Sequence, residues 1–169
     1  MKTKKLVIGA VFAALVCVAT FAVRIPAGLS GGYVNMGDAV VLLSGYLLGP
    51  VLGGLAGGIG SALADAFGGY MVFVVPTLVI KFFMAFVSAK LFESIFKTRS
   101  WAGLIICGII AECVMISGYF LFEIVLTGSV FAAAAGVWGN ITQAVFGIFV
   151  SAVAYKLLST KKEIMKFFK

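Results

Sequence analysis

Residues 35–81 read NMGDAVVLLSGYLLGPVLGGLAGGIGSALADAFGGYMVFVVPTLVIK and contain the features that decide the fold. Two acids, a lysine, a Gly-Pro pair and a series of spaced glycines interrupt otherwise apolar sequence. Glycine favours the end of a helix and proline the first turn of the next one, so Gly49-Pro50 predicts a break between two helices. The sequence before and after residues 35–81 is typical of plainer membrane helices.

The composition is that of an integral membrane protein. The 169 residues are 63% hydrophobic and 11% charged, whereas soluble domains carry about a quarter charged residues. The apolar runs are long and lack the alternation of a β-barrel, so helices are expected to span the bilayer. The net charge of +7 comes mostly from basic residues at the ends of apolar segments. The positive-inside rule explains that placement better than nucleic-acid binding does.

The hydrophobic pattern predicts an all-α membrane protein, a single domain over residues 1–169 with six transmembrane helices. The first apolar run continues to Val23, which is long enough for a retained helix rather than a signal peptide. Loops are expected at residues 24–36, 68–76, 97–100 and 127–136. The expected helices cover about 5–23, 37–48, 51–67, 77–96, 101–126 and 137–158.

The distribution of basic residues indicates whether residues 37–67 cross the membrane once or twice. With two crossings and the N-terminus inside, Arg24 is outside, while Lys97, Arg99 and the tail lysines Lys161, Lys162, Lys166 and Lys169 are inside. One crossing would put that loop and tail outside, against the positive-inside rule. We therefore expect six helices with both termini cytoplasmic, the second and third helices being short and tilted or buried in protein.

Small residues recur at helical spacing in two places. Small side chains four residues apart let helices approach closely in lipid. In the third helix we expect them to pack the second and third helices together, the alternative being a sliding or docking surface. In the first helix packing and docking stay open. The residues are Gly49, Gly53 and Gly57, then Gly54, Gly58 and Ala62, and in the first helix Gly9 with Ala13 and Ala10 with Ala14.

The sequence lacks the residues that several kinds of chemistry require. The chain has no histidine and no G-x-x-x-x-G-K stretch, so it carries no histidine-ligated metal site and no P-loop for ATP. Cys17, Cys107 and Cys113 lie in apolar runs and are expected to pack as small apolar residues, without a disulfide or metal cluster. We expect no cofactor. We also expect that the chain is not an enzyme, because no group of residues that could activate a nucleophile is recognisable.

Polar residues concentrate in the outer half of the expected bundle, which predicts an outward-facing pocket with a dry floor. Each buried charge is costly in a membrane and needs a reason. Glu112 falls near mid-membrane. The candidate substrate-binding residues are Asn35, Lys81, Glu112, Tyr119, Trp138, Asn140 and Gln143.

Some of these polar residues also have structural interpretations. Asp38 is expected to cap the second helix, in preference to contacting substrate. Asp65 and Lys81 could form an ion pair or contact the ligand. Glu112 could be a protonated core carboxylate or a ligand group. Aromatic residues such as Tyr119 and Trp138 could lie at the interface or stack on a flat ring.

Three motifs resemble the substrate-binding S components of energy-coupling factor (ECF) vitamin importers. These are GYVNMGDAVVLLSGYLLGP at residues 32–50, GGIGSALADAFGGY at 57–70 and PTLVIK at 76–81. The resemblance covers nearly the whole chain. Ala10 and Ala14 match the A-x-x-x-A pattern that in this family contacts the transmembrane coupling subunit.

The resemblance implies an ABC-type importer of a prokaryotic plasma membrane. Its S component captures a vitamin outside and docks on one transmembrane coupling subunit and two ATP-binding subunits. The motifs resemble most the branch that includes proteins for vitamin B6 and hydroxymethylpyrimidine, often labelled riboflavin-type. Riboflavin, pantothenate, folate and thiamine are alternatives, as is a stand-alone secondary transporter, which should show polar groups through the whole depth.

Overall fold

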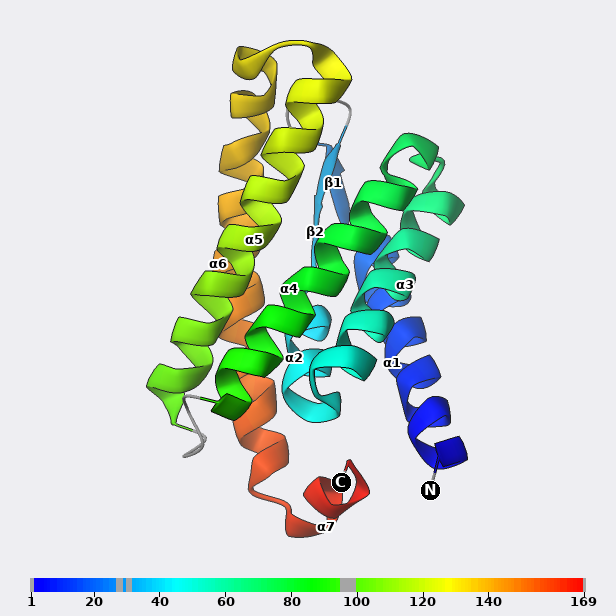
Figure 1. The fold of residues 1–169 in the computed structure, drawn as a ribbon, viewed down its shortest axis with the longest axis vertical. Helices are drawn as coiled ribbons and strands as arrows, with labels where there is room; N and C mark the ends of the chain where they lie inside the picture. Colours follow the sequence, from blue (N-terminus) through cyan, green and yellow to red (C-terminus); the bar gives the residue numbers. More distant parts are fainter. Residues whose placement is uncertain (1, 27–28, 30–31, 95–99, 169) are drawn as a thin grey trace.

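The computed structural model describes residues 2–26, 29, 32–94 and 100–168. Over these residues the chain forms a helical bundle with a small β-hairpin (Figure 1). The elements in chain order are α1 (Lys2–Ala22), β1 (Arg24–Pro26), β2 (Tyr33–Asn35), α2 (Gly37–Leu48), α3 (Pro50–Gly68), the 3₁₀ turn η1 (Met71–Phe73), α4 (Val74–Ser94), α5 (Trp101–Thr127), α6 (Val130–Ser159) and the short α7 (Lys162–Phe167).

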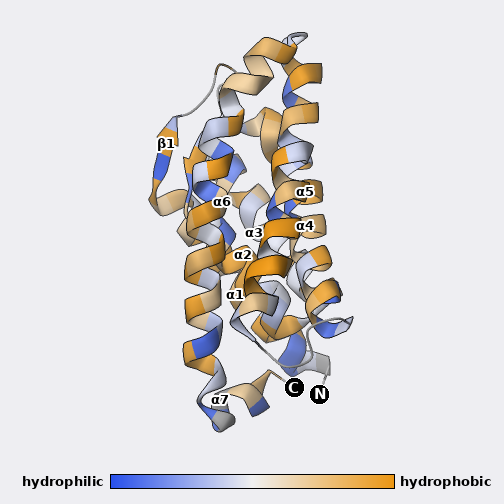
Figure 2. Cartoon of the chain, turned by 90° about the vertical axis from the view of Figure 1, so that its left-hand side faces the viewer, coloured by the Kyte–Doolittle hydropathy of each residue, from blue (hydrophilic) through white to orange (hydrophobic). Residues whose placement is uncertain are grey.

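Five helical segments among the described residues are long and apolar enough to cross a membrane: α1, α3, η1 with α4, α5 and α6. Hydrophobic residues follow the helices along most of their length (Figure 2). Helix α2 has 12 residues and therefore spans about 18 Å, less than the ~30 Å of a bilayer core. Six crossings thus stay a prediction, with α2 the short member.

The break at Gly49-Pro50 is confirmed. Gly49 has φ +82° and ψ 178°, a conformation that is essentially restricted to glycine. Pro50 follows in the first turn of α3, where its missing N–H removes no helical hydrogen bond. Contacts of Gly53 with Ser44 and of Gly57 with Val41 show that α2 and α3 run antiparallel.

Two expected loops are wrong in part. Residues 24–36 hold an antiparallel hairpin, with Arg24 opposite Asn35 and Pro26 opposite Tyr33. Residues 127–136 are mostly helix, because α6 begins at Val130. The Ser129 hydroxyl caps α6 by accepting from the Ala132 N–H at 3.2 Å, and the alanines that follow are strong helix formers.

The connection expected at residues 68–76 is also shorter than predicted. It contains η1, and α4 already begins at Val74, with Pro76 in its first turn where proline is tolerated. The loop with Lys97 and Arg99, the end of the fourth helix at residues 95–96, and Lys169 lie outside the described residues.

Both chain termini lie at one end of the bundle, which we call the terminal end (Figure 1). The hairpin, η1 and the turn between α5 and α6 lie toward the opposite end, which we call the hairpin end. Apart from Lys81, the described lysines gather at the terminal end, in the first turns of α1, late in α4 and α6, and around α7. Arg24, in β1, is placed at the hairpin end.

The interior toward the terminal end is apolar and aromatic. Val41, Leu42, Met84 and Leu104 are fully or almost fully buried there. Below them Tyr46 packs against aromatic rings of α4 and α6 in tilted and edge-on contacts, and its hydroxyl donates to the Leu104 carbonyl at 2.9 Å. The polar residues described in the next subsection therefore rest on a closely packed and largely apolar layer.

The spaced glycines serve internal packing, as expected for the α2–α3 contact. A Cβ on Gly53 would lie 2.6 Å from the Ser44 carbonyl oxygen, and one on Gly57 would lie 3.0 Å from Val41. Gly54 and Gly58 differ, because they face Phe82 and Leu78 of α4 instead. Helix α3 is thus packed closely on two sides.

Replacing Gly53 with alanine should destabilise the fold by about 1–3 kcal/mol, the usual cost of overpacking. The new Cβ would meet backbone atoms of Ser44 and Gly45, at 2.6 and 2.7 Å, which cannot move aside separately. Gly108→Ala is the matched control, since its Cβ would meet only side-chain atoms, the nearest being Ile148 at 3.1 Å. Thermal unfolding of both variants in one detergent measures the difference, and equal melting temperatures would contradict the tight α2–α3 contact.

Candidate binding site

A cavity lies between the helices at the hairpin end. Residues of α1, β2, α3, η1, α4, α5 and α6 form its walls. The cavity volume is about 40 Å³ in the described state. A single water needs about 10–15 Å³ on this measure. The cavity is therefore narrow in this state, and a larger solute can enter only when wall residues move apart.

Four helices each present a pair of wall residues one turn apart. Residues separated by four positions share a helix face, so each pair points the same way. The members are polar apart from one glycine. The pairs are Ser61 with Asp65 on α3, Thr77 with Lys81 on α4, Tyr119 with Glu123 on α5, and Gly136 with Asn140 on α6.

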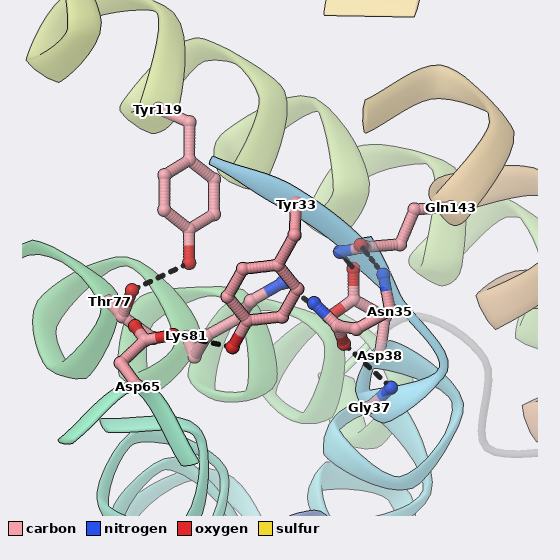
Figure 3. A network of polar contacts seen from close by, with 9 residues as sticks. All are labelled: Tyr33, Asn35, Gly37, Asp38, Asp65, Thr77, Lys81, Tyr119 and Gln143. Atoms are coloured by element: carbon pink, nitrogen blue, oxygen red, sulfur yellow. Dashed lines mark hydrogen bonds and ion pairs between the residues drawn. The ribbon is translucent and has the colours of Figure 1, made fainter. Parts of the chain in front are cut away.

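Asp38 is the hub of a hydrogen-bond network beneath the cavity (Figure 3). Its Oδ1 forms an ion pair with the Lys81 ammonium, and its Oδ2 accepts from Nε2 of Gln143 at 2.6 Å. The Gln143 Oε1 accepts in turn from the backbone N–H of Asn35 at 2.7 Å. Asp38 and Lys81 are about 2% exposed or less. One carboxylate therefore orients two cavity residues. Through these contacts and the Gln143–Asn35 hydrogen bond, the network connects α2, α4, α6 and β2.

A second set of contacts lies on the opposite wall. The Tyr33 hydroxyl donates to Asp65 at 2.5 Å, and the hydroxyls of Thr77 and Tyr119 are 2.9 Å apart. Burial and the neighbouring Asp65 raise the pKa of Tyr33 above its usual range, so this hydroxyl keeps its proton. The Lys81 ammonium lies 5.4 Å from the centre of the Tyr119 ring, within reach of a cation–π contact that links the two sets.

Five of the proposed substrate-binding residues meet at this cavity. They are Asn35, Lys81, Tyr119, Asn140 and Gln143. Asp65, expected as a structural or pocket residue, also lies on the wall. The resemblance and the residue types together selected six of the fourteen wall residues.

One expectation for the acidic residues is wrong, and one of the two alternatives left open for Asp65 and Lys81, their ion pair, is not formed. Asp38 does not cap α2, because its oxygens bind Lys81 and Gln143 and the helix has no side-chain cap. Lys81 pairs with Asp38, not with Asp65, which accepts from Tyr33 instead. Spacing along the chain places these side chains at one end but does not show which acid faces Lys81.

Glu112 and Trp138 are not part of the cavity wall. Glu112 is 2% exposed and lies below the cavity, near Asp38. Trp138 is 75% exposed and lies on the outside of α6. It is two residues from Asn140, about 200° around the helix, so the two side chains point in nearly opposite directions.

Eight wall residues were not among the site residues selected from the sequence. They are Gly32, Tyr33, Phe73 and Gly136, and the polar residues Thr20, Ser61, Thr77 and Glu123. Ser61, Thr77 and Glu123 each stand one turn from a selected residue on the same helix, which is a signal that the sequence does contain. Thr20 had no comparable signal, since it is the single wall residue that α1 contributes among the described residues.

Ala10 and Ala14 lie on the exposed face of α1. The opposite face carries Ile8 and Phe12, which pack into the core, and Gly9, which faces Leu52 of α3. The Gly9 position thus serves internal packing. The Ala10–Ala14 strip is left uncovered by the described part of the chain, as a docking surface requires.

Comparison with solved structures identifies the fold. The chain resembles the protein described under "Structure and mechanism of the S component of a bacterial ECF transporter", with a TM-score of 0.72. The match covers 95% of this chain and 98% of that one at 19% identity. A protein of Pyrococcus woesei, described as "uncharacterized protein in gap 3′ region", is 38% identical over 135 residues, or 80% of this chain and 88% of that protein.

A bundle of long apolar helices around a polar cavity is the architecture of an integral membrane protein. The model of the family "ECF-type riboflavin transporter, S component" matches residues 1–160, and the chain belongs to this family. It is therefore a vitamin-transporter S component and not an enzyme.

Proposed function

We propose that the chain captures a small, flat, hydroxylated vitamin ring, with vitamin B6 (pyridoxine) or hydroxymethylpyrimidine as the preferred substrates. The composition of the cavity wall carries this proposal. Its aromatic side chains are Tyr33, Phe73 and Tyr119, and the remaining wall residues are polar or glycine. One small ring can stack on an aromatic side chain while its hydroxyl groups bond to the polar wall.

Riboflavin is the second candidate, because the matching family model is named for riboflavin transporters. Its three fused rings include an apolar dimethylbenzene part. The described wall offers that part no aliphatic side chain. We therefore rank riboflavin below a smaller and more polar ring as the candidate substrate.

Lys81, Gln143, Asn140, Asn35 and Tyr119 are proposed as the substrate contacts. Gln143 is already oriented by Asp38, which lowers the entropy cost of binding, and Lys81 lines the cavity while paired with Asp38. Asn140 lies on the same wall, one turn of α6 from Gln143, and can offer an amide donor and acceptor.

Delivery across the membrane is proposed to follow docking on an ATP-driven module. The module consists of one transmembrane coupling subunit, which would meet Ala10 and Ala14, and two ATP-binding subunits. In this arrangement the six helices cross a prokaryotic plasma membrane, with the terminal end cytoplasmic and the cavity facing outward. The concentration of lysines at the terminal end supports that orientation.

Binding titrations with the purified protein test the substrate. Pyridoxine, hydroxymethylpyrimidine and riboflavin are added separately, and quenching of Trp and Tyr fluorescence or calorimetry gives each Kd. We expect the tightest Kd for one of the two small rings. Tighter binding of riboflavin would overturn the preferred substrate but keep the vitamin-binding function, whereas no binding of any vitamin would contradict that function.

Asn140→Ala should weaken vitamin binding by about tenfold, the equivalent of one lost hydrogen bond of about 1.4 kcal/mol. Trp138→Ala is the matched control on the same helix, because Trp138 is 75% exposed and outside the cavity. Titration of folded protein measures both Kd values. Loss of affinity in the Trp138 variant alone would mean that the ligand binds elsewhere.

A further inference from the structure

Glu112 is a buried acid that the proposed binding site does not use. It lies on α5, is 2% exposed, and neither carboxylate oxygen has a hydrogen-bond partner among the described residues. An ionised carboxylate in this position would be shielded from bulk water and would lack a donor among the described residues. Such a group is strongly disfavoured in the interior of a protein.

Glu112 and Asp38 approach one another beside Gly147. A Cβ placed on Gly147 would lie 2.8 Å from Oε1 of Glu112 and 3.0 Å from Cβ of Asp38. The bare backbone of α6 at this glycine thus leaves room for two acidic side chains side by side. The absence of a side chain at position 147 is required by the pair.

The charges around Glu112 balance only when one acid is neutral. Helix α2 presents Asp38 and, further along, Tyr46; α4 presents Lys81; α6 presents Gly147; Cys107 lies on the same helix as Glu112. Lys81 is the positively charged member of this group and already pairs with Asp38. Asp38 has its oxygens occupied by Lys81 and Gln143, so Glu112 is the acid left for the proton.

We infer that Glu112 carries a proton and acts as a reserve hydrogen-bond donor to Asp38, so that Lys81 can leave Asp38 and bind the substrate. In the described state Lys81 lines the cavity but is held by Asp38. If Lys81 turns to a substrate oxygen, the Glu112 hydroxyl donates to Asp38 in its place. No proton is gained or lost, and Asp38, Lys81 and Glu112 each have a partner in the substrate-bound state.

Glu112 is a positioning residue in this arrangement, and its role in binding rests on the proposed vitamin site. The protonation state can be tested without any substrate. The role in binding is tested separately, by the response of the same group to the vitamin. A failure of the vitamin proposal would therefore leave the first result standing.

Infrared spectroscopy of the purified protein detects the proton directly. We expect a carboxylic-acid C=O band at neutral pH that shifts in heavy water and disappears in Glu112→Gln. We also expect it to disappear in Asp38→Asn, where Glu112 ionises to become the partner of Lys81. The proposal is overturned if the wild type lacks the band, or if the band persists in either variant; the heavy-water test needs the wild type alone.

Addition of the vitamin that binds in titration tests the coupling. We expect the Glu112 band to move to lower frequency, because its hydroxyl then donates to Asp38. Glu112→Leu should weaken binding about tenfold and Glu112→Gln, whose amide can still donate to Asp38, should restore most of that loss. If the band does not move when the vitamin is added, or if the Leu and Gln variants have equal affinities, Glu112 is not coupled to vitamin binding.

Discussion

Replacing Lys81 with methionine should lower the free energy of unfolding by about 3–5 kcal/mol, the usual cost of breaking a buried ion pair by removing one partner. Asp38 would keep the Gln143 amide but lose its cation, while remaining about 0% exposed. Unfolding in a graded mixture of detergent and SDS measures the loss. Lys90→Met is the matched control, because Lys90 is an exposed residue of the same helix.

A second change separates charge from packing at this position. Adding Asp38→Asn to Lys81→Met removes the unpaired charge, and we expect the double variant to regain most of the lost stability. Asp38→Asn alone should cost less than Lys81→Met, since Glu112 stands near enough to serve as a partner for Lys81. Equal stability of Lys81→Met and the wild type would show that the pair does not hold the four elements together.

Replacing Ala10 or Ala14 with leucine should leave vitamin binding intact and nearly abolish vitamin uptake. Both alanines lie on the exposed face of α1, away from the cavity at the hairpin end. A leucine there adds bulk where two helices are proposed to approach closely, which small residues permit. Uptake of labelled vitamin by cells that also make the coupling module measures the effect.

The control for the docking surface is Ala134→Leu, which adds the same bulk to an exposed position of α6. We expect normal uptake for this variant. Titration of each purified variant confirms that the cavity is unchanged. Normal uptake in both α1 variants would remove the docking role of this face, whatever the substrate proves to be.

The helices were predictable from sequence because bilayer chemistry leaves few alternatives. Apolar length, the Gly49-Pro50 pair and the small residues of α3 located five long helical segments and the turn to α2. The hairpin was missed because three-residue strands on either side of a glycine-containing segment lack a periodic signal. The start of α6 was missed because small uncharged residues at 130–136 were interpreted as a loop, although alanine favours helix.

The location of the cavity was predictable, but the side-chain contacts within it were only partly predictable. Depth along the helices brought Asp65, Lys81, Tyr119 and Asn140 to one end. The rotation of each helix about its axis decides which side chains meet, and it depends on packing between helices that are distant in sequence. Asp38 therefore could not be matched to Lys81 in advance.

Helical geometry, which can be worked out from the sequence, explains why Trp138 and Glu112 are not on the cavity wall. Trp138 stands about 200° from Asn140, so both could not face one cavity. Glu112 shares a face with Tyr119, seven residues away, but lies about 10 Å further along α5. It is therefore below the wall and not on it.

Mass spectrometry of small molecules released from the purified, denatured protein tests most directly that the hairpin-end cavity holds a vitamin. We expect a B6 vitamer or a pyrimidine precursor at near-stoichiometric yield from the wild type, and a clearly lower yield from Asn140→Ala prepared in parallel. Release of the same ligand at equal yield from both proteins, or of no vitamin from a wild type that also binds none in titration, would contradict the account.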